Sequence, residues 1–266
     1  MINKTLLKAT AAAYGISLND TALDRFDRYA ELLVSWNEKV NLTAITEPDE
    51  IVMKHFVDSL VVLGKVDMPK GASLLDVGTG AGFPGLALKI ARPDLNITLL
   101  DSTEKKLNIV REIAQELGFE TDEAAPADEM GIPMYGMNKE AVHIIHARAE
   151  EAGQSKAFRE QFDFVTSRAV ANLQVLAEYC IPFVRITGRF LALKGPDGQE
   201  ELREGLGAIR TLGGRFLELL EYDLVSAFDE TAEASAARSI IIVRKKKKTP
   251  HAFPRRGDRI KKVPLV

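Results

Sequence analysis

The chain has 266 residues, 46% of them apolar and 27% charged, and a net charge of −3; this ordinary globular composition excludes a fibrous, collagenous or mainly disordered protein. Its single cysteine, Cys180, excludes an internal disulfide and a cysteine-based zinc site, and no metal is expected. No apolar run approaches the roughly 18 to 20 residues that cross a bilayer, and the first residues lead into a polar stretch, so a cytoplasmic protein without membrane contact is expected.

The beginning of the chain has a helical pattern. Apolar residues recur at three- and four-residue steps over residues 23–40, and Asn19 or Asp20 can cap the start, so an amphipathic helix is expected there. A second helix is expected from the apolar stripe of residues 51–62, with Gly64 as its stop.

From residue 72 on, short apolar runs alternate with helical segments, which is typical of a parallel sheet with crossover helices. Strands are expected over residues 73–77, 97–101, 142–146, 162–166, 189–193, 217–224 and 239–243. Helices are expected over residues 85–91, 104–117, 172–181 and 198–212. Because no helix separates the last two strands, we expect an α/β fold with a seven-stranded, mostly parallel sheet and an antiparallel last strand.

This pattern divides the chain into an N-terminal helical region over residues 1–70, a sheet-forming domain over residues 71–246 and a C-terminal tail over residues 247–266. Residues 119–140 fit the sheet pattern badly, because they are acidic and contain Pro and Gly. A loop of that length is either functional or a solvated insertion, and an insertion is favoured.

The end of the chain is strongly basic. Residues 238–266 contain eleven Lys and Arg against one acid, Asp258, which gives +10, so the first 237 residues carry 24 bases against 37 acids, or −13. Such a segment suits a nucleic-acid phosphate backbone. It can equally be a solubilising or disordered end, and charge alone does not choose between the two.

The sharpest local signal is the sequence LLDVGTGAGFPG at residues 74–85, a strand that leads through a glycine cluster into a helix. Glycines allow a sharp turn and a close approach to a ligand, and a tight turn alone does not need so many. The spacing from Gly80 to Gly85 also satisfies the dinucleotide pattern. Asp76 can face the ammonium of a methionine moiety but would repel a pyrophosphate, and Pro84 removes an N–H that a pyrophosphate would use. Both features favour S-adenosylmethionine over NAD.

Residues at the next strand ends can complete a nucleoside site. Asp101 follows the second strand, where a carboxylate can accept hydrogen bonds from both ribose hydroxyls or cap the following helix. Ala149 and Glu150 follow the third strand and could flank an adenine, and Arg168 follows the fourth strand and could reach the site. A helix-start acid for Glu150 and a surface ion pair for Arg168 remain equally open.

Missing motifs narrow the reaction. The turn after the fourth strand reads Ser-Arg-Ala-Val-Ala instead of the Asn/Asp-Pro-Pro-aromatic turn of exocyclic-amine methylation, and Cys180 is expected in the core rather than as a nucleophile. An acceptor that is already nucleophilic, such as guanine N7, needs no catalytic base, and no catalytic residue is predicted. His55, Asp58 and Ser59 could share a helix face but cannot form a hydrolase triad, and a packed core histidine is favoured.

Several motifs together resemble the bacterial 16S ribosomal RNA guanine-N7 methyltransferase family, also known as ribosomal small subunit methyltransferase G or glucose-inhibited division protein B. The resemblance covers nearly the whole chain. It rests on Trp36-Asn37 with Asn41-Leu42-Thr43, on His55-x-x-Asp58-Ser59-Leu60, on the glycine loop from Asp76 to Gly85, on Arg148-Ala149-Glu150-Glu151, on Ser167-Arg168-Ala169-Val170-Ala171, on Lys194-Gly195, and on Phe253-Pro254-Arg255-Arg256-Gly257 with Pro264-Leu265. The stretch before Arg148 is longer than is usual in the family.

The resemblance implies a Rossmann-like class I methyltransferase fold, S-adenosylmethionine as methyl donor, and a guanine of 16S rRNA, in the small subunit or an assembly intermediate, as acceptor. The family's cofactor contacts fall on Gly78, Phe83, Ala149, Glu150 and Arg168, to which the analysis of the residues adds Asp76, Gly80 and Asp101. RNA contacts are expected from Arg148, Lys245, Lys246, Lys247, Lys248, Arg255 and Arg256. The oligomeric state stays open, with a monomer favoured.

Two other functions are weighed against this one. A nucleotide-binding oxidoreductase would use the same glycine loop, but Asp76 and Pro84 count against it. A non-enzymatic RNA-binding protein could keep the fold without the chemistry, but the intact loop and Asp101 count against that.

Overall fold

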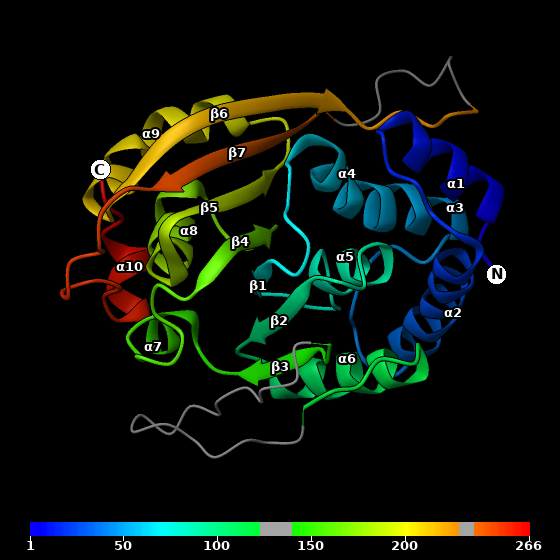
Figure 1. The fold of residues 1–266 in the computed structure, drawn as a ribbon. Helices are drawn as coiled ribbons and strands as arrows, with labels where there is room; N and C mark the ends of the chain where they lie inside the picture. The colour runs from blue at the N-terminus through cyan, green and yellow to red at the C-terminus, as the bar shows by residue number, and fades with distance from the viewer. Residues whose placement is uncertain (123–139, 229–236) are drawn as a thin grey trace.

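A seven-stranded sheet forms the centre of the computed structural model, which describes residues 1–122, 140–228 and 237–266 (Figure 1). The strands lie in the order β3-β2-β1-β4-β5-β7-β6. β1 to β5 pair in parallel, and β7 is antiparallel to both β5 and β6. The predicted α/β sheet with an antiparallel last strand is therefore confirmed. The strands are β1 Ser73–Val77, β2 Asn96–Asp101, β3 His143–His146, β4 Phe162–Arg168, β5 Val184–Lys194, β6 Gly214–Asp223 and β7 Ala237–Lys245.

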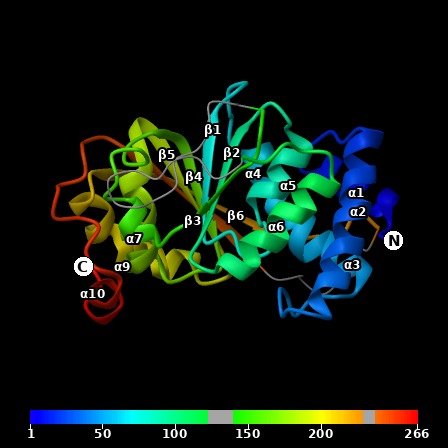
Figure 2. The same ribbon diagram turned by 90° about the horizontal axis from the view of Figure 1, so that it is seen from below.

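Helices cover both faces of the sheet (Figure 2). One hydrophobic cluster packs α5 (Gly85–Ala91) and α6 (Glu104–Glu116) against one face. A second cluster joins the other face to α7 (Ala149–Ala152), α8 (Leu173–Cys180), the short 3₁₀ helix η2 (Ile181–Phe183), α9 (Gly198–Thr211) and α10 (Gly257–Lys262). Strands that are buried on both faces have continuous apolar runs, which is why the sequence pattern located them well.

The N-terminal helices belong to the first of these clusters and are not a separate unit of packing. They are α1 (Lys4–Ala13), α2 (Asp20–Asn37), α3 (Pro48–Glu50), the π-helix η1 (Ile51–Val57) and α4 (Asp58–Lys65). The side chain of Asn19 accepts a hydrogen bond from the Ala22 amide at 2.8 Å, as expected for a helix cap. The two predicted helices are therefore present, and the second of them begins as a π-helix.

The ends of these two helices differ from the predicted ends. α2 stops at Asn37 instead of Val40, because the Asn37 side chain accepts hydrogen bonds from the amides of Leu42 and Thr43 at 2.8 and 3.0 Å and turns the chain. Gly64 lies inside α4, so its predicted role as the stop is wrong. A Cβ at Gly64 would collide with the carbonyl oxygen of Tyr14, so the glycine allows close packing.

β5 is longer than the sequence pattern indicated. It begins at Val184, five residues before the predicted start, because a register shift between Phe162 and Phe164 interrupts its pairing with β4. Thr187 has a φ of 74° at this irregularity. The bulge breaks the alternation of apolar and polar residues, so only the regular half of the strand was visible in the sequence.

The C-terminal tail packs against the second face of the sheet. The guanidinium of Arg159 donates to the carbonyl oxygens of Thr249 and Phe253, both at 2.8 Å, and Ile260 of α10 is fully buried. The alternative of a disordered end is therefore wrong for these residues. The division of the chain at residues 70 and 246 stays a prediction, and most of the predicted insertion, residues 123–139, lies outside the described residues.

Among the helices of the described residues, none combines the length and apolar character that crossing a membrane requires.

The hydroxyl of Tyr29 connects α2 to the glycine loop, since it is buried and donates to the carbonyl oxygen of Ala81 at 2.7 Å. Tyr29→Phe should lower the free energy of unfolding by about 1–2 kcal/mol, because it leaves that carbonyl unsatisfied in the core. Urea unfolding measures this loss. Tyr14→Phe is the control, because its hydroxyl lies at a partly exposed site where water can replace it. Equal stability of Tyr29→Phe and the wild type would contradict the connection.

Candidate functional site

A cleft of about 670 Å³ opens at the carboxyl ends of β1, β2, β3 and β4. The strand order reverses between β1 and β4, and open α/β sheets bind ligands at such a switch point. Seven of the eight predicted cofactor residues line this cleft: Gly78, Gly80, Phe83, Asp101, Ala149, Glu150 and Arg168. The structure thus brings together residues from four strand ends; that they contact a cofactor remains a prediction.

Asp76, the eighth predicted residue, does not line the cleft. It is fully buried, and its Oδ2 atom accepts hydrogen bonds from the Thr79 hydroxyl at 2.7 Å and the Gly85 amide at 2.9 Å. Burial raises its pKa to about 6, against the effect of these two donors. Asp76 therefore holds the two ends of the glycine loop together, and its contact with a ligand ammonium stays a prediction.

The glycine loop has a shape that side chains would prevent. Gly78 and Gly80 have φ values of 73° and 59°, in the left-handed region that favours glycine. A Cβ at Gly78 would also lie 2.6 Å from Cγ2 of Val170, so the loop packs directly on the turn after β4. Because these glycines have no side chain, their backbone lines the cleft directly.

Asp101 fixes the loop from the other side. Its Oδ2 accepts a hydrogen bond from the Gly80 amide at 2.9 Å, and its Oδ1 accepts one from the Thr103 amide at 2.9 Å. The carboxylate is partly exposed at the cleft wall. It therefore connects the ends of β1 and β2 and can still accept further hydrogen bonds from a ligand.

Phe83, His55 and Arg168 line one wall of the cleft, and the buried ring of Tyr29 lies behind Phe83. Phe83 stacks on Tyr29 at 5.1 Å and on His55 at 4.6 Å between ring centroids, with interplanar angles of 14° and 15°. The guanidinium of Arg168 lies 5.3 Å from the centroid of Phe83, within the range of a cation–π contact. Phe83 was predicted only from the family resemblance, and the stack explains why a large ring is needed there.

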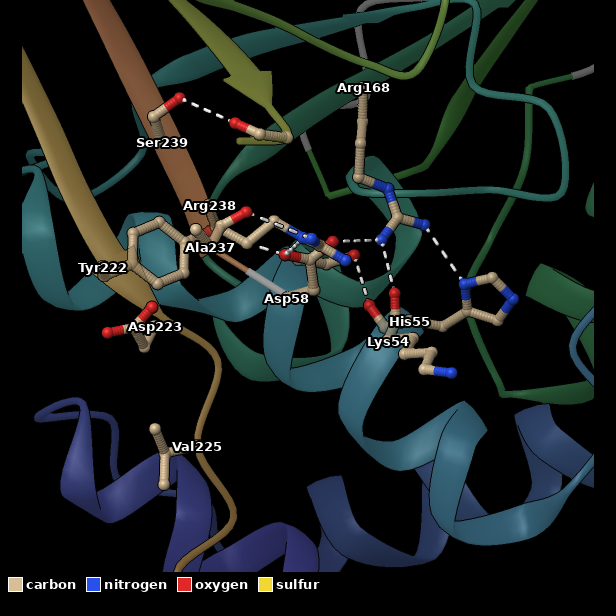
Figure 3. A network of polar contacts seen from close by, with 12 residues as sticks. Lys54, His55, Asp58, Arg168, Tyr222, Asp223, Val225, Ala237, Arg238 and Ser239 are labelled. Atoms are coloured by element: carbon tan, nitrogen blue, oxygen red, sulfur yellow. Dashed lines mark hydrogen bonds and ion pairs between the residues drawn. The ribbon is translucent and has the colours of Figure 1, made fainter. Parts of the chain in front are cut away.

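Arg168 belongs to a buried network that Figure 3 shows. Its Nη1 donates to Oδ2 of Asp58 and to the carbonyl oxygen of Lys54, both at 2.9 Å, and its Nη2 lies 3.3 Å from Nδ1 of His55. The side chains of Arg168 and Asp58 are only 14% and 8% exposed. The alternative of a surface ion pair for Arg168 is therefore wrong, because both side chains are largely buried. Solvent screens the attraction of a pair at this depth only weakly.

Asp58 joins two further strands to the network. Its Oδ1 accepts a hydrogen bond from Nε of Arg238 in β7 at 3.2 Å and one from the Tyr222 hydroxyl of β6 at 3.4 Å. Both carboxylate oxygens of Asp58 thus have partners. The carboxylate balances part of the positive charge that Arg168 and Arg238 bring to the site.

His55 lies in the cleft wall as a neutral side chain. Burial and then the nearby charge of Arg168 lower its pKa to about 4, and its Nε2 forms a hydrogen bond of 2.8 Å with the Thr43 hydroxyl. Asp58 pairs with arginines and the Ser59 hydroxyl donates to the carbonyl oxygen of His55 at 2.6 Å, so these residues form no hydrolase triad. The preference for a packed histidine is confirmed, although this histidine also faces the cleft.

The C-terminal tail supplies a wall of the cleft that was not predicted from the sequence. Gly257, Asp258 and Lys261 line it beside Glu150, and a Cβ at Gly257 would collide with Oε1 of Glu150. Thr43, Lys106 and Tyr179 also line the cleft. Of these, only Thr43 lies in a quoted motif; the others had no distinctive local pattern.

Two of the side chains predicted to contact RNA, those of Lys245 and Arg255, have partners inside the protein, and their contact with RNA stays a prediction. Lys245 is buried, its ammonium bonds to the carbonyl oxygen of Ile181 at 2.8 Å and to the Thr249 hydroxyl, and burial lowers its pKa to about 8. Arg255 binds the fully buried Glu178 through Nε at 2.9 Å and Nη2 at 2.6 Å. Both residues anchor the tail.

The other predicted RNA contacts are exposed but lie in two places. Arg148 lines the mouth of the cleft, and Arg256 is exposed just before α10. The three exposed lysines at positions 246–248 follow β7, which runs antiparallel to β5. They therefore lie at the amino ends of the parallel strands, whereas the cleft lies at the carboxyl ends. Contact of all these residues with RNA remains a prediction.

Within residues 1–122, 140–228 and 237–266, no three or more His, Cys, Asp or Glu side chains are grouped so that they could hold a metal ion. Cys180 is fully buried in the second hydrophobic cluster, and burial raises the pKa of its thiol well above the usual value. Its predicted place in the core is confirmed.

Comparison with known proteins shows one consistent similarity. A family model described as rRNA small subunit methyltransferase G matches residues 22–125 and 135–222. The chain is 40% identical to the ribosomal RNA small subunit methyltransferase G of Clostridium perfringens (strain 13) over 260 residues, 98% of both chains. It is 43% identical to the protein of the same name from Streptococcus gordonii over 253 residues, 94% of both chains. The crystal structure of a SAM-dependent O-methyltransferase from Thermotoga maritima has a similar fold, with a TM-score of 0.50 and 15% identity over 81% of this chain and 72% of that chain.

The pKa of His55 gives the fold a dependence on pH. The folded chain holds this pKa near 4, whereas an unfolded histidine titrates near 6.5, so the unfolded state takes up the proton first as the pH falls. His55 should therefore contribute stability above about pH 6.5 and lose that contribution between about pH 6.5 and 4.

Arg168→Gln should raise the pKa of His55, because it removes the neighbouring cation, as an NMR titration of the imidazole would show. Arg148→Gln is the control; an unchanged pKa in Arg168→Gln would leave burial as the sole cause.

Proposed function

Because the chain belongs to the rRNA small subunit methyltransferase G family, we propose that it transfers a methyl group from S-adenosylmethionine to N7 of a guanine in 16S ribosomal RNA. The single observation that carries this proposal is the cleft at the switch point of the sheet, walled by the glycine loop and Asp101. We further propose that the substrate is the RNA of a small subunit or of an assembly intermediate in the cytoplasm, and that the protein acts as a monomer.

The residues of the cleft fit S-adenosylmethionine. Asp101 and Glu150 offer carboxylates for the hydroxyl and amino groups of adenosine, and Arg168 offers a guanidinium for the carboxylate of the methionine part. Among the described residues, Oδ1 of Asp76 is the buried side-chain atom that lacks a hydrogen-bond partner. A cationic ligand above the loop would favour the ionised form of this carboxylate.

S-adenosylmethionine supplies a methyl group that its sulfonium has already activated. The lone pair of guanine N7 forms the new bond to the methyl carbon while the carbon–sulfur bond breaks and its electron pair stays on sulfur, so no proton has to be removed. This agrees with the state of His55, which is neutral, hydrogen-bonded to Thr43 and stacked on Phe83. The protein's task is to align the two reactants and to keep water away from them.

The distribution of charge supports RNA as the substrate. Lys106, Arg148 and Lys261 line the cleft mouth, and Arg256 is exposed beside it, so phosphates of a bound RNA would find cations on both sides of the site. These residues lie on three separate segments of the chain. The net charge of −13 of the first 237 residues is therefore no guide to the charge around the cleft.

Transfer of labelled methyl from S-adenosylmethionine to small-subunit particles that lack their own methylation tests the function. We expect label in 7-methylguanosine, identified by the mass of the nucleoside, and label in another nucleoside would overturn the proposed acceptor.

Asp101→Ala should bind S-adenosylmethionine about 10- to 100-fold more weakly in calorimetry, because a carboxylate acceptor is lost. Glu104→Ala is the matched control, since Glu104 is exposed on the same turn but does not line the cleft. Unchanged affinity in Asp101→Ala would remove this residue from the cofactor site.

Substitution of the exposed lysines 246–248 tests whether RNA also contacts the end of the sheet that lies away from the cleft. Replacing all three with Ala should weaken RNA binding and make the plot of log affinity against log salt less steep, because fewer counterions are released. Filter binding over a range of salt concentrations measures the slope. Replacing the exposed Lys8, Lys65 and Lys70 removes the same charge elsewhere and is the control. An unaltered slope in the first variant would return these lysines to a solubilising role.

A further inference from the structure

A second pocket of about 650 Å³ adjoins the cleft and shares a wall with it. The shared wall consists of His55 and the turn Arg168, Ala169 and Val170 at the end of β4. Ala169 has a φ of 57°, a conformation that costs energy for a residue other than glycine and is frequent at functional sites. The turn thus separates the two pockets by a single layer of chain.

A lysine and a glutamate lie side by side in the second pocket. Nζ of Lys194, the last residue of β5, lies 2.6 Å from Oε2 of Glu201 in α9 and donates to the carbonyl oxygen of Ala171 at 2.6 Å. Oε2 of Glu201 also accepts a hydrogen bond from the Leu173 amide at 2.7 Å. The two side chains are 7% and 24% exposed, so both are held in place and the carboxylate still faces the pocket.

We propose that this pocket receives the acceptor guanine and that Lys194 and Glu201 recognise its Watson–Crick edge. This inference rests on the proposed function and adds the residues that choose the base. Along that edge guanine presents an acceptor, O6, followed by two donors, N1–H and N2–H₂, which match an ammonium beside a carboxylate. Adenine presents a donor where guanine has O6 and an acceptor where guanine has N1–H, so in the same orientation it opposes both side chains.

The same orientation places the reacting atom correctly. N7 lies on the opposite side of the purine from N1 and N2, so a guanine whose donors face Glu201 turns N7 away from the Lys194–Glu201 pair. Transfer forms the bond from N7 to the methyl carbon and breaks the carbon–sulfur bond, which moves the positive charge from sulfur to the purine. A carboxylate bound to N1–H and N2–H₂ stabilises that charge as it develops, so Glu201 assists the transition state as well as the choice of base.

The experiment compares Glu201→Gln with Glu200→Gln, an exposed neighbour outside the pocket. For small-subunit particles without methylation, Glu201→Gln should reduce kcat/KM for methyl transfer about 10- to 100-fold, because the amide opposes one guanine donor. The affinity for S-adenosylmethionine in calorimetry should stay unchanged. Glu200→Gln should match the wild type in both measurements. Full activity of Glu201→Gln would overturn the assignment.

A second comparison uses, for each protein, the ratio of its activities on two substrates, so the amount of folded variant cancels. Once the methylated guanosine is mapped, particles are reconstituted with inosine at that position, which lacks the N2 amino group. The wild type should lose activity on inosine, whereas Glu201→Gln should show little further loss; an absent inosine penalty in the wild type, or an equal penalty in both proteins, would overturn the assignment. If the wild type forms no 7-methylguanosine on unmodified particles, the proposed function itself fails, and this outcome is distinct from the others.

Discussion

The carboxylate of Asp58 is the point at which the separate parts of this molecule meet. It lies on α4, in the N-terminal helical part, and its two oxygens bind Arg168 from the end of β4 and Arg238 from β7. Arginines at this depth would be costly without a counter-charge, and removing one partner of a buried pair typically costs about 3–5 kcal/mol. The N-terminal helices are thus required to neutralise the site as well as to cover the sheet. The position of Arg168 depends on this pair.

Arg168 in turn determines the form of the site. It lies over Phe83, lowers the pKa of His55 and begins the turn that separates the cleft from the second pocket. The glycine loop packs on the same turn through the contact of Gly78 with Val170. One wall therefore serves both pockets, and a displacement of Arg168 would alter the cleft and the second pocket together. This arrangement suits a reaction whose only requirement is the alignment of two reactants.

Much of the fold could be predicted from the sequence, because buried parallel strands and amphipathic helices leave regular apolar patterns. The strand β1 and the helix α5 have the predicted bounds, whereas the prediction for β5 was too short, because a bulge breaks the pattern in its first half. In the site, glycines and strand-end acids were recognisable because their chemistry depends on local sequence. Charge was less informative: Lys245 and Lys246 are neighbours of the same type, yet one is buried against Ile181 and the other is exposed. Which of them is buried depends on tertiary packing that a run of lysines does not encode.

The tail has a consequence for the order in which the molecule is assembled. It leaves the end of β7, is bound by Arg159 and by the Arg255–Glu178 pair, and supplies Gly257 and Lys261 to the cleft. Figure 1 shows its helix α10 beside α7 and α8. Because synthesis proceeds from the N-terminus, all seven strands precede this segment and the sheet can form while one wall of the cleft is still missing. The wall that Gly257, Asp258 and Lys261 supply can therefore be added only after the strands have been synthesised. A nascent chain that already contains the glycine loop and Asp101 still has an incomplete cleft until this segment has docked.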